Sequence, residues 1–432
     1  MKRHVFLLVT LFTMSTVAAQ QQPIIFPKDS IPSVIERITG KENKGFSAHM
    51  NLQLYTSCAA SFTENELDEV AFKLNRFKLE IIGNINRKFS YHFRQSFNKY
   101  SNPFALDNLS SSVEYAYLTY HLSDRFSITA GKQFLMLGGY EYYVNPIKVR
   151  EFSEFNNYVN CFLAGVSATW NVTPTQELNF QIVNNRNGGD ADTYLHGLPT
   201  DVEATKVPLI STINWNSYYL DKAIQLRYAA SWGQQAKGRN IMYLTAGNVY
   251  EKGPWIAYMD FMYSRQGIDN KGIISALPRI DLEDPQTAQH TEYFTTIANV
   301  DYRFHPNWNA YLKGIYESGK IYKANGIFEK GTYRRTWCGQ VCVEYYPMRN
   351  SELLIFLHYQ YKRNKLLKPA RNLDAIDPNT QRISLGLVYS IPVFLIPGSS
   401  YRKGERVLYL GRTFSLFKAL TTIPLPFFVH CK

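Results

Sequence analysis

Apolar and polar residues alternate at every second position through most of the chain. The clearest stretch covers residues 382–394, where one set of alternate positions is apolar: Ile383, Leu385, Leu387, Tyr389, Ile391 and Val393. The positions between them hold Arg382, Ser384, Gly386 and Ser390. Successive side chains of an extended strand point to opposite faces. This stretch therefore predicts a β-strand with one apolar and one polar face.

The same alternation predicts about sixteen strands. They lie near residues 46–57, 71–82, 89–97, 113–122, 126–131, 161–171, 177–184, 207–215, 222–232, 239–250, 255–265, 292–304, 308–318, 332–346, 353–362 and 382–393. The second strand loses its alternation near Asn75, which predicts a β-bulge. An even number of antiparallel strands is what a closed bacterial membrane barrel requires.

The connections between these strands alternate in length. The short ones lie around Asn84, Asp124, Thr173, Ser217, Gly253, Pro306 and Pro347. The long ones lie around Asn65, Asn102, Asn145, Gly188, Asp281, Gly326 and Asn372, and the one near Gln235 is a short exception. Membrane barrels have short periplasmic turns and long outer loops, whereas a soluble sandwich has no reason to sort its loops in this way. We therefore predict an all-β fold, a transmembrane antiparallel β-barrel of about sixteen strands.

The two ends of the chain differ from this pattern. Lys2, Arg3, an apolar run at 5–12 and small residues up to Ala19 predict a secretory signal peptide at 1–19. Residues 20–45 are predicted to be a periplasmic lead, 46–394 the barrel, and 395–432 a C-terminal extension without packed structure. The predicted location is the bacterial outer membrane.

Composition agrees with a barrel and narrows the chemistry. The 432 residues carry 15% aromatic side chains, Tyr being the most abundant of them, and no apolar run is long enough for a transmembrane helix. The formal net charge of +12 is partly contributed by the two ends, so it does not point to a nucleic-acid partner. The five cysteines are scattered, which predicts neither a disulfide framework nor a metal site, and no cofactor is expected.

The connection at 138–159 is rich in aromatic and charged residues. A barrel of this width has an open lumen unless something narrows it. We predict that this third outer loop folds inward, with Tyr140, Glu141, Lys148 and Arg150 as candidate constriction residues. An ordinary solvated loop is the alternative.

Several short motifs point to one family. The segments NRFKL at 75–79, DRFSITAGKQ at 124–133, GGYE at 138–141 and NPI at 145–147 resemble the phosphate-selective porin O and P family. The resemblance covers nearly all of 46–394. It implies a sixteen-stranded general porin in contact with outer-membrane lipid, usually a homotrimer, whose best-known members pass phosphate along luminal arginines. The spacing of Ser384, Gly386, Tyr389 and Ile391 also resembles the terminal signal that the barrel assembly machinery recognises.

The parity of each strand predicts which charged side chains face the lumen. The candidate pore-lining and anion-binding bases are Lys78, Arg94, Arg227, Arg303, Lys313, Arg334, Lys362 and Arg382. The carboxylates predicted to face inward are Glu80, Glu114, Glu177, Asp301, Glu317 and Glu344. A phosphate-specific pathway needs closely spaced cations with few competing carboxylates. The mixed lining predicts instead a general or weakly anion-preferring pore for small hydrophilic solutes and ions, phosphate among them.

The sequence bears on two other classes of protein. A barrel enzyme is not predicted, because His49, His92, His121, His305 and His358 lie on different strands and no nucleophile-elbow motif occurs. A closed or plugged barrel that acts in binding or adhesion is the alternative function.

Overall fold

The computed structural model describes residues 46–99, 106–279, 285–348 and 352–396. The predicted signal peptide, the predicted periplasmic lead and the predicted extension from residue 397 onward lie outside the described residues.

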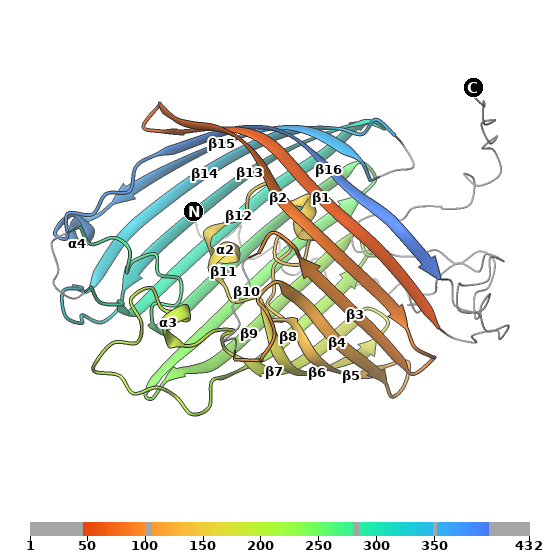
Figure 1. Ribbon diagram of the computed structural model, residues 1–432, viewed down its shortest axis with the longest axis horizontal. Helices are drawn as coiled ribbons and strands as arrows, with labels where there is room; N and C mark the ends of the chain where they lie inside the picture. The colour runs from red at the N-terminus through yellow and green to blue at the C-terminus, as the bar shows by residue number, and fades with distance from the viewer. Residues whose placement is uncertain (1–45, 100–105, 280–284, 349–351, 397–432) are drawn as a thin grey trace, which may run out of the picture.

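Sixteen antiparallel strands close into one barrel (Figure 1). They are β1 (Ser47–Thr63), β2 (Glu66–Asn84), β3 (Phe89–Ser96), β4 (Val113–His121), β5 (Phe126–Phe134), β6 (Phe162–Thr173), β7 (Gln176–Asn184), β8 (Leu209–Tyr219), β9 (Ile224–Ala236), β10 (Arg239–Lys252), β11 (Trp255–Ile268), β12 (Gln289–His305), β13 (Trp308–Ile321), β14 (Gly331–Tyr345), β15 (Leu354–Leu366) and β16 (Thr380–Ile396). Each strand pairs with its neighbours in sequence, and β1 pairs with β16. The predicted fold class and strand count are confirmed.

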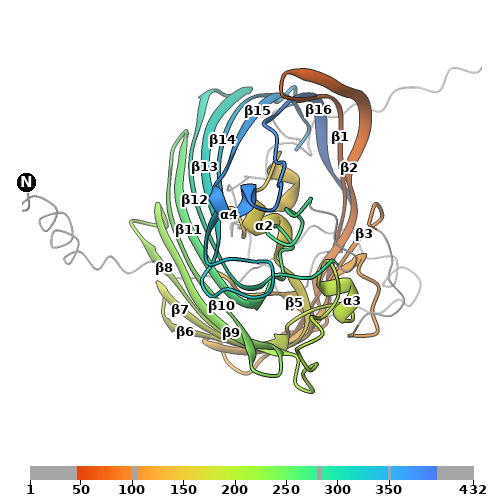
Figure 2. The same cartoon turned by 90° about the vertical axis from the view of Figure 1, so that its left-hand side faces the viewer.

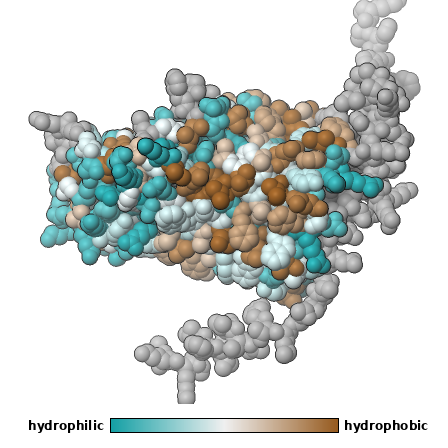
Figure 3. Space-filling view, turned by 90° about the horizontal axis from the view of Figure 1, so that it is seen from below, coloured by the Kyte–Doolittle hydropathy of each residue, from teal (hydrophilic) through white to brown (hydrophobic). Residues whose placement is uncertain are grey.

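Alternate residues of each strand lie on the outer and the inner face of the barrel wall. On β14, Trp337, Val341 and Val343 are exposed on the outside, whereas the intervening Gln340 and Cys342 are buried on the inside. Figure 3 shows apolar residues gathered in the middle of one wall and hydrophilic residues concentrated at the end that carries the long loops. An apolar outer band around a polar interior is the arrangement that a lipid bilayer selects in a barrel. Among the described residues, no helix is long and apolar enough to cross a membrane.

The β1–β2 hairpin holds both the predicted bulge and one wrong prediction. Tyr55 pairs with Arg76 and Thr56 pairs with Leu74, so Asn75 is the extra residue of a bulge, as predicted. The long loop expected around Asn65 is wrong, because β1 and β2 continue to a tight turn at 64–65 whose residues have φ angles of 47° and 72°. Side chains on both faces of this part of β2 are exposed. Burial therefore imposes no alternation that the sequence could reveal.

The other long connections gather at one end of the barrel. Their described residues are 97–99, 106–112, 135–161, 185–208, 269–279, 285–288, 322–330 and 367–379. They include the short helices η1 (Pro146–Lys148), α2 (Glu154–Tyr158), α3 (Asp190–Thr193) and α4 (Lys368–Arg371). Two-residue turns at 174–175, 253–254 and 306–307 mark the opposite end. Figure 2 looks into the long-loop end and shows α2 inside the ring of strands. The wall thus surrounds a loop rather than an empty lumen.

Candidate functional site

The loop inside the barrel is the third connection at the long-loop end, residues 135–161, which we call L3. It begins at the end of β5, carries η1 and α2, and returns to β6. Ser153 caps α2, because its hydroxyl accepts a hydrogen bond from the amide of Asn156 at 3.3 Å.

The first part of L3 is attached directly to the wall. Its backbone amides donate to polar side chains of three strands: Met136 to Gln181 at 2.8 Å, Gly138 to Thr245 at 2.6 Å, and Tyr140 and Glu141 to the Asp260 carboxylate at 2.8 and 2.9 Å. A Cβ atom at Gly138 would lie 2.4 Å from the carbonyl oxygen of Arg227, so only glycine permits this approach. The wall therefore supplies the hydrogen bonds that a buried loop backbone needs.

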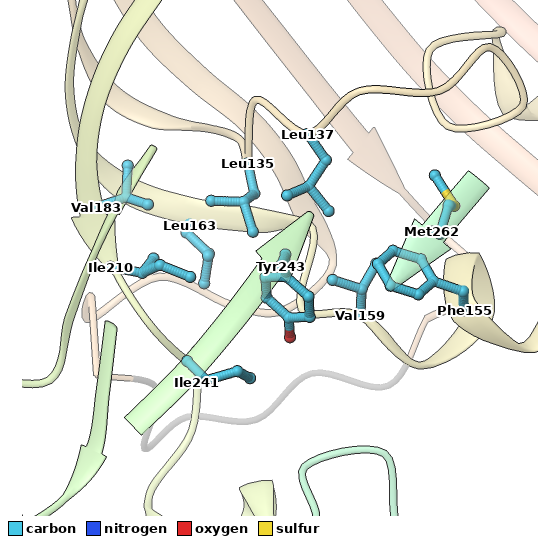
Figure 4. Packing of buried hydrophobic residues seen from close by; sticks show 10 residues of the cluster. All are labelled: Leu135, Leu137, Phe155, Val159, Leu163, Val183, Ile210, Ile241, Tyr243 and Met262. Carbon is cyan, nitrogen blue, oxygen red and sulfur yellow. The ribbon is translucent and has the colours of Figure 1, made fainter. Parts of the chain in front are cut away.

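A small apolar core holds L3 against the same wall. Leu135, Leu137, Phe155 and Val159 of the loop pack with Leu163, Val183, Ile210, Ile241, Tyr243 and Met262 of the strands (Figure 4). All ten side chains are buried. Burying each large apolar side chain contributes about 1.5–3 kcal/mol, so L3 is a packed element and not a solvated loop.

Ion pairs fasten L3 to the opposite wall. We call them the L3 clamp: Glu141 with Lys313 at 2.9 Å, Glu154 with Arg334 at 2.6 Å, Glu154 with Lys362, and Glu151 with Arg382. Arg150 adds a pair of opposite sense with Glu344 at 3.3 Å. The clamp joins L3 to β13, β14, β15 and β16, so the loop crosses the lumen.

Glu154 is the centre of the clamp. Burial disfavours its charged form, but the charges of Arg334 and Lys362 outweigh burial and lower the pKa of Glu154 below its ordinary value. The Glu317 carboxylate of β13 accepts a hydrogen bond of 2.8 Å from the backbone amide of Glu154, at the start of α2. A carboxylate at this position satisfies an amide that has no partner within the helix.

Lys271 from the connection between β11 and β12 holds the other side of α2. Its ammonium group lies 4.1 Å from the centre of the Phe155 ring and donates to the carbonyl oxygen of Phe155 at 3.3 Å. Burial lowers the pKa of Lys271 to about 8. A second outer connection therefore helps to hold α2 in the lumen.

A second group of charges lies on β2–β4 and in the residues that follow β3. We call it the wall cluster, and it consists of Lys78, Glu80, His92, Arg94, Lys99 and Glu114. Glu114 pairs with Lys78 at 2.9 Å, Arg94 at 2.7 Å and Lys99 at 2.7 Å. Glu80 pairs with His92 at 2.9 Å and lies 3.6 Å from Arg94. Three lysine and arginine cations thus share two carboxylates.

The remaining sequence-predicted bases lie apart from both groups. Arg227 stacks on Tyr143 of L3 at 4.4 Å, and Arg303 lies 4.0 Å over the Tyr346 ring near the short-turn end. Of the candidate constriction residues, Tyr140 packs against Tyr258 with 4.8 Å between ring centres, and Lys148 is the last residue of η1. Lys148 contributes to the lining of a cavity and not to the clamp.

This cavity of about 180 Å³ lies on the short-turn side of L3. Its charged lining consists of Glu141, Lys148, Arg150, Asp301, Arg303, Lys313, Glu344 and Glu352. Four basic and four acidic side chains therefore face one space, so its lining is mixed in sign.

Asp260 and Arg76 are among the residues that hold L3 and that sequence reasoning missed. The Asp260 carboxylate on β11 accepts hydrogen bonds from the amides of Tyr140 and Glu141. Arg76 on β2 donates to the carbonyl oxygen of Val149 at 2.8 Å. Asp260 had a usable signal, since it is a carboxylate between Met259 and Phe261 on a predicted strand. Arg76 follows the bulge at Asn75, where strand parity no longer assigns a face.

A closed barrel with an apolar exterior, a polar interior and an inward loop is an outer-membrane barrel of the porin class. The family model for phosphate-selective porin O and P matches residues 47–391. The chain belongs to this family, and its location is the outer membrane. Family and fold are those of a channel rather than an enzyme.

Solved structures share the fold. The outer-membrane channel DcaP of Acinetobacter baumannii has a TM-score of 0.55 at 11% identity, covering 80% of this chain and 98% of that one. A loop-deletion mutant of OmpT from Vibrio cholerae has a TM-score of 0.52 at 9% identity, covering 80% and 100%. OmpF of Salmonella typhi, in complex with daunomycin, has a TM-score of 0.51 at 12% identity, covering 81% and 98%. Such identities indicate a common fold alone, and no curated protein matches the chain.

Proposed function

We propose that this outer-membrane channel is a water-filled pore for passive diffusion of small hydrophilic solutes and ions, with a weak preference for anions and no phosphate specificity. The observation that carries the proposal is the pairing of luminal bases with carboxylates. Lys313, Arg334, Lys362 and Arg382 each bind a carboxylate of L3.

A phosphate pathway would need the same donors for its ligand. Arginine recognises an oxyanion through its N–H groups. In Arg334 these groups already donate to Glu154, Asp377 and Asn364. Phosphate would have to displace carboxylates that also hold the loop in place. We infer that these bases shape the lumen and bind no solute.

A weak anion preference is proposed to come from the wall cluster, where bases outnumber carboxylates. Fixed charges in a pore act on ions in proportion to their number and proximity. A small excess of positive charge favours anions without selecting one.

The test is planar-bilayer recording of the purified protein in a potassium chloride gradient, followed by added phosphate. We expect a small reversal potential on the anion side and little block of chloride current by phosphate. A reversal potential on the cation side, or strong block by micromolar phosphate, would contradict the proposal.

The closed binding barrel is a second candidate, favoured by the number of strands that L3 contacts. The loop bonds to β2, β7, β10 and β11 and to each strand of β13–β16, and it has its own apolar core. Folded protein that inserts into bilayers without conducting would support this candidate and reject the pore.

A homotrimer in outer-membrane lipid, inserted by the barrel assembly machinery, is the form in which we propose that the channel works. The support is membership of a porin family. Native mass spectrometry from detergent tests the trimer, and a monomer at micromolar protein would reject it.

A further inference from the structure

Three basic side chains lie on the outside of the barrel near its long-loop end. Arg335 on β14 and Arg363 and Lys365 on β15 are exposed, and we call them the outer basic patch. Their sequence neighbours Arg334, Lys362 and Asn364 face the interior, where they bond to one another or to L3. The patch is therefore separated from the lumen by the wall itself.

Strand register places these charges side by side. Arg335 is directly opposite Lys365, and Arg363 is directly opposite Trp337. Like charges at directly paired positions destabilise a sheet. Within the part of the chain that the structure describes, no carboxylate lies within ion-pair distance of any of the three.

On an adjoining part of the same outer surface, two neighbouring bases have a carboxylate as their partner. Arg265 on β11 and Lys320 on β13 flank Glu292 on β12, which lies 3.5 Å from Arg265 and 2.5 Å from Lys320. Among the residues that the structure describes, a carboxylate lies between these two bases and none lies beside the outer basic patch. A counter-charge from outside the chain would complete the patch.

The position of the patch indicates the source of that charge. Trp337 on β14 and Tyr359 and Tyr361 on β15 are exposed on the same outer face. Each lies two or four residues closer to the middle of the wall than the nearest base of the patch on its own strand. Aromatic residues at the border of the apolar band lie at the level of lipid headgroups. Because the long loops are on the outer side of the membrane, the patch meets the headgroups of the outer leaflet.

We propose that the outer basic patch binds the phosphate groups of an anionic lipid headgroup in the outer leaflet. Two arginine forks and one lysine match a phosphorylated headgroup, because guanidinium groups bind phosphate oxygens in pairs. Lipid binding relieves the repulsion between Arg335 and Lys365. The proposal is independent of what the pore conducts.

The experiment measures lipid retention by the purified full-length protein in detergent, by native mass spectrometry. The probes are a bisphosphorylated glycolipid (lipid A), the same glycolipid with its phosphates removed, and inorganic phosphate as competitor. The variants are R335Q/R363Q/K365Q and the matched control R265Q, in which Glu292 keeps its pair with Lys320.

We expect wild type and R265Q to retain the phosphorylated glycolipid equally. Each base removed from the patch should weaken retention about fivefold, since a basic residue near an anionic surface contributes about 1 kcal/mol. The dephosphorylated glycolipid should not be retained, and millimolar phosphate should not displace the lipid.

Equal retention by the triple variant, or equal retention of the dephosphorylated lipid, would overturn the proposal. Displacement by millimolar phosphate would also overturn it, because the patch would then be a free-phosphate site. If the triple variant does not fold, R335Q alone decides the question: a roughly fivefold loss supports the proposal and no loss rejects it.

Discussion

The L3 clamp and the wall cluster are both networks of bases and carboxylates inside one barrel, yet their partners differ. In the clamp, bases of the strands bind carboxylates of an inserted loop. In the wall cluster, the carboxylates are residues of β2 and β4, and two of the three bases, Lys78 and Arg94, are residues of β2 and β3. The clamp therefore joins two parts of the molecule, whereas the wall cluster mainly sets local charge.

The two networks therefore have different roles, although both consist of bases and carboxylates inside the barrel. Removing a clamp charge should change the shape of the lumen, because L3 loses an attachment. Removing a charge of the wall cluster should change ion preference and leave the shape intact. Substitutions in the two networks should therefore have different effects.

The largest effect is expected for Glu154→Gln. The substitution leaves Arg334 and Lys362 without their shared L3 charge, and breaking a buried ion pair from one side costs about 3–5 kcal/mol. We expect α2 to detach from β14 and β15, so that single-channel conductance rises and trypsin cleaves L3 at Lys148 or Arg150. Conductance and protease resistance equal to those of wild type would show that the clamp does not hold the loop.

A smaller and different effect is expected for Glu114→Gln. Lys78, Arg94 and Lys99 would lose the carboxylate that they share, so the lumen would gain positive charge. The anion-to-cation permeability ratio from reversal potentials should rise about two- to fivefold, as for a charge interaction of up to about 1 kcal/mol in water. L3 should keep its protease resistance, and a loosened loop would contradict the separation of roles.

Acid should act on the clamp through Glu154. The folded pKa of Glu154 lies below its ordinary value of 4.5, so its stabilisation is fully present above pH 4.5 and is lost as the pH falls through the lowered folded pKa. Conductance should be steady from neutral pH to about 4.5 and should rise below it. The same acid transition in Glu154→Gln would assign it to another group.

The smallest effect is expected for Glu203→Gln, a control outside both networks. Glu203 pairs with Lys237 at 2.7 Å, but both side chains are more than 60% exposed. Exposed pairs contribute about 0–1 kcal/mol. Conductance, ion preference and protease resistance should match wild type, and any change in L3 would mean that these assays are not specific for the clamp.

The sequence predicts the wall far better than the contents of the barrel. Alternation locates every strand, because each strand has one face on lipid and one on a polar interior. It fails at the tip of β2, where Val70 and Phe72 are exposed and the strand has no buried face to mark its course.

Alternate positions along each strand also predicted which bases face inward, but they could not predict the partners of these bases. Glu151 and Glu154 lie in a loop without periodicity, and they meet Arg382, Arg334 and Lys362 only because L3 crosses the lumen. The path of L3 depends on long-range contacts, such as those of Gly138 with Thr245 and of Tyr140 with Asp260. No local pattern of the sequence encodes such contacts.

The seam between β1 and β16 has a consequence for the kinetics of insertion. It pairs Ser61 with Arg382 and Ala48 with Ile396, residues from opposite ends of the barrel sequence. Contacts of such high sequence separation form slowly, because the entropy of ring closure is lost before any bond is gained. Until they form, two rows of unpaired amides and carbonyls would face hydrocarbon, at a cost of several kcal/mol for each group. A half-inserted sheet therefore cannot persist in lipid, and β1 must pair with β16 as the barrel enters the bilayer.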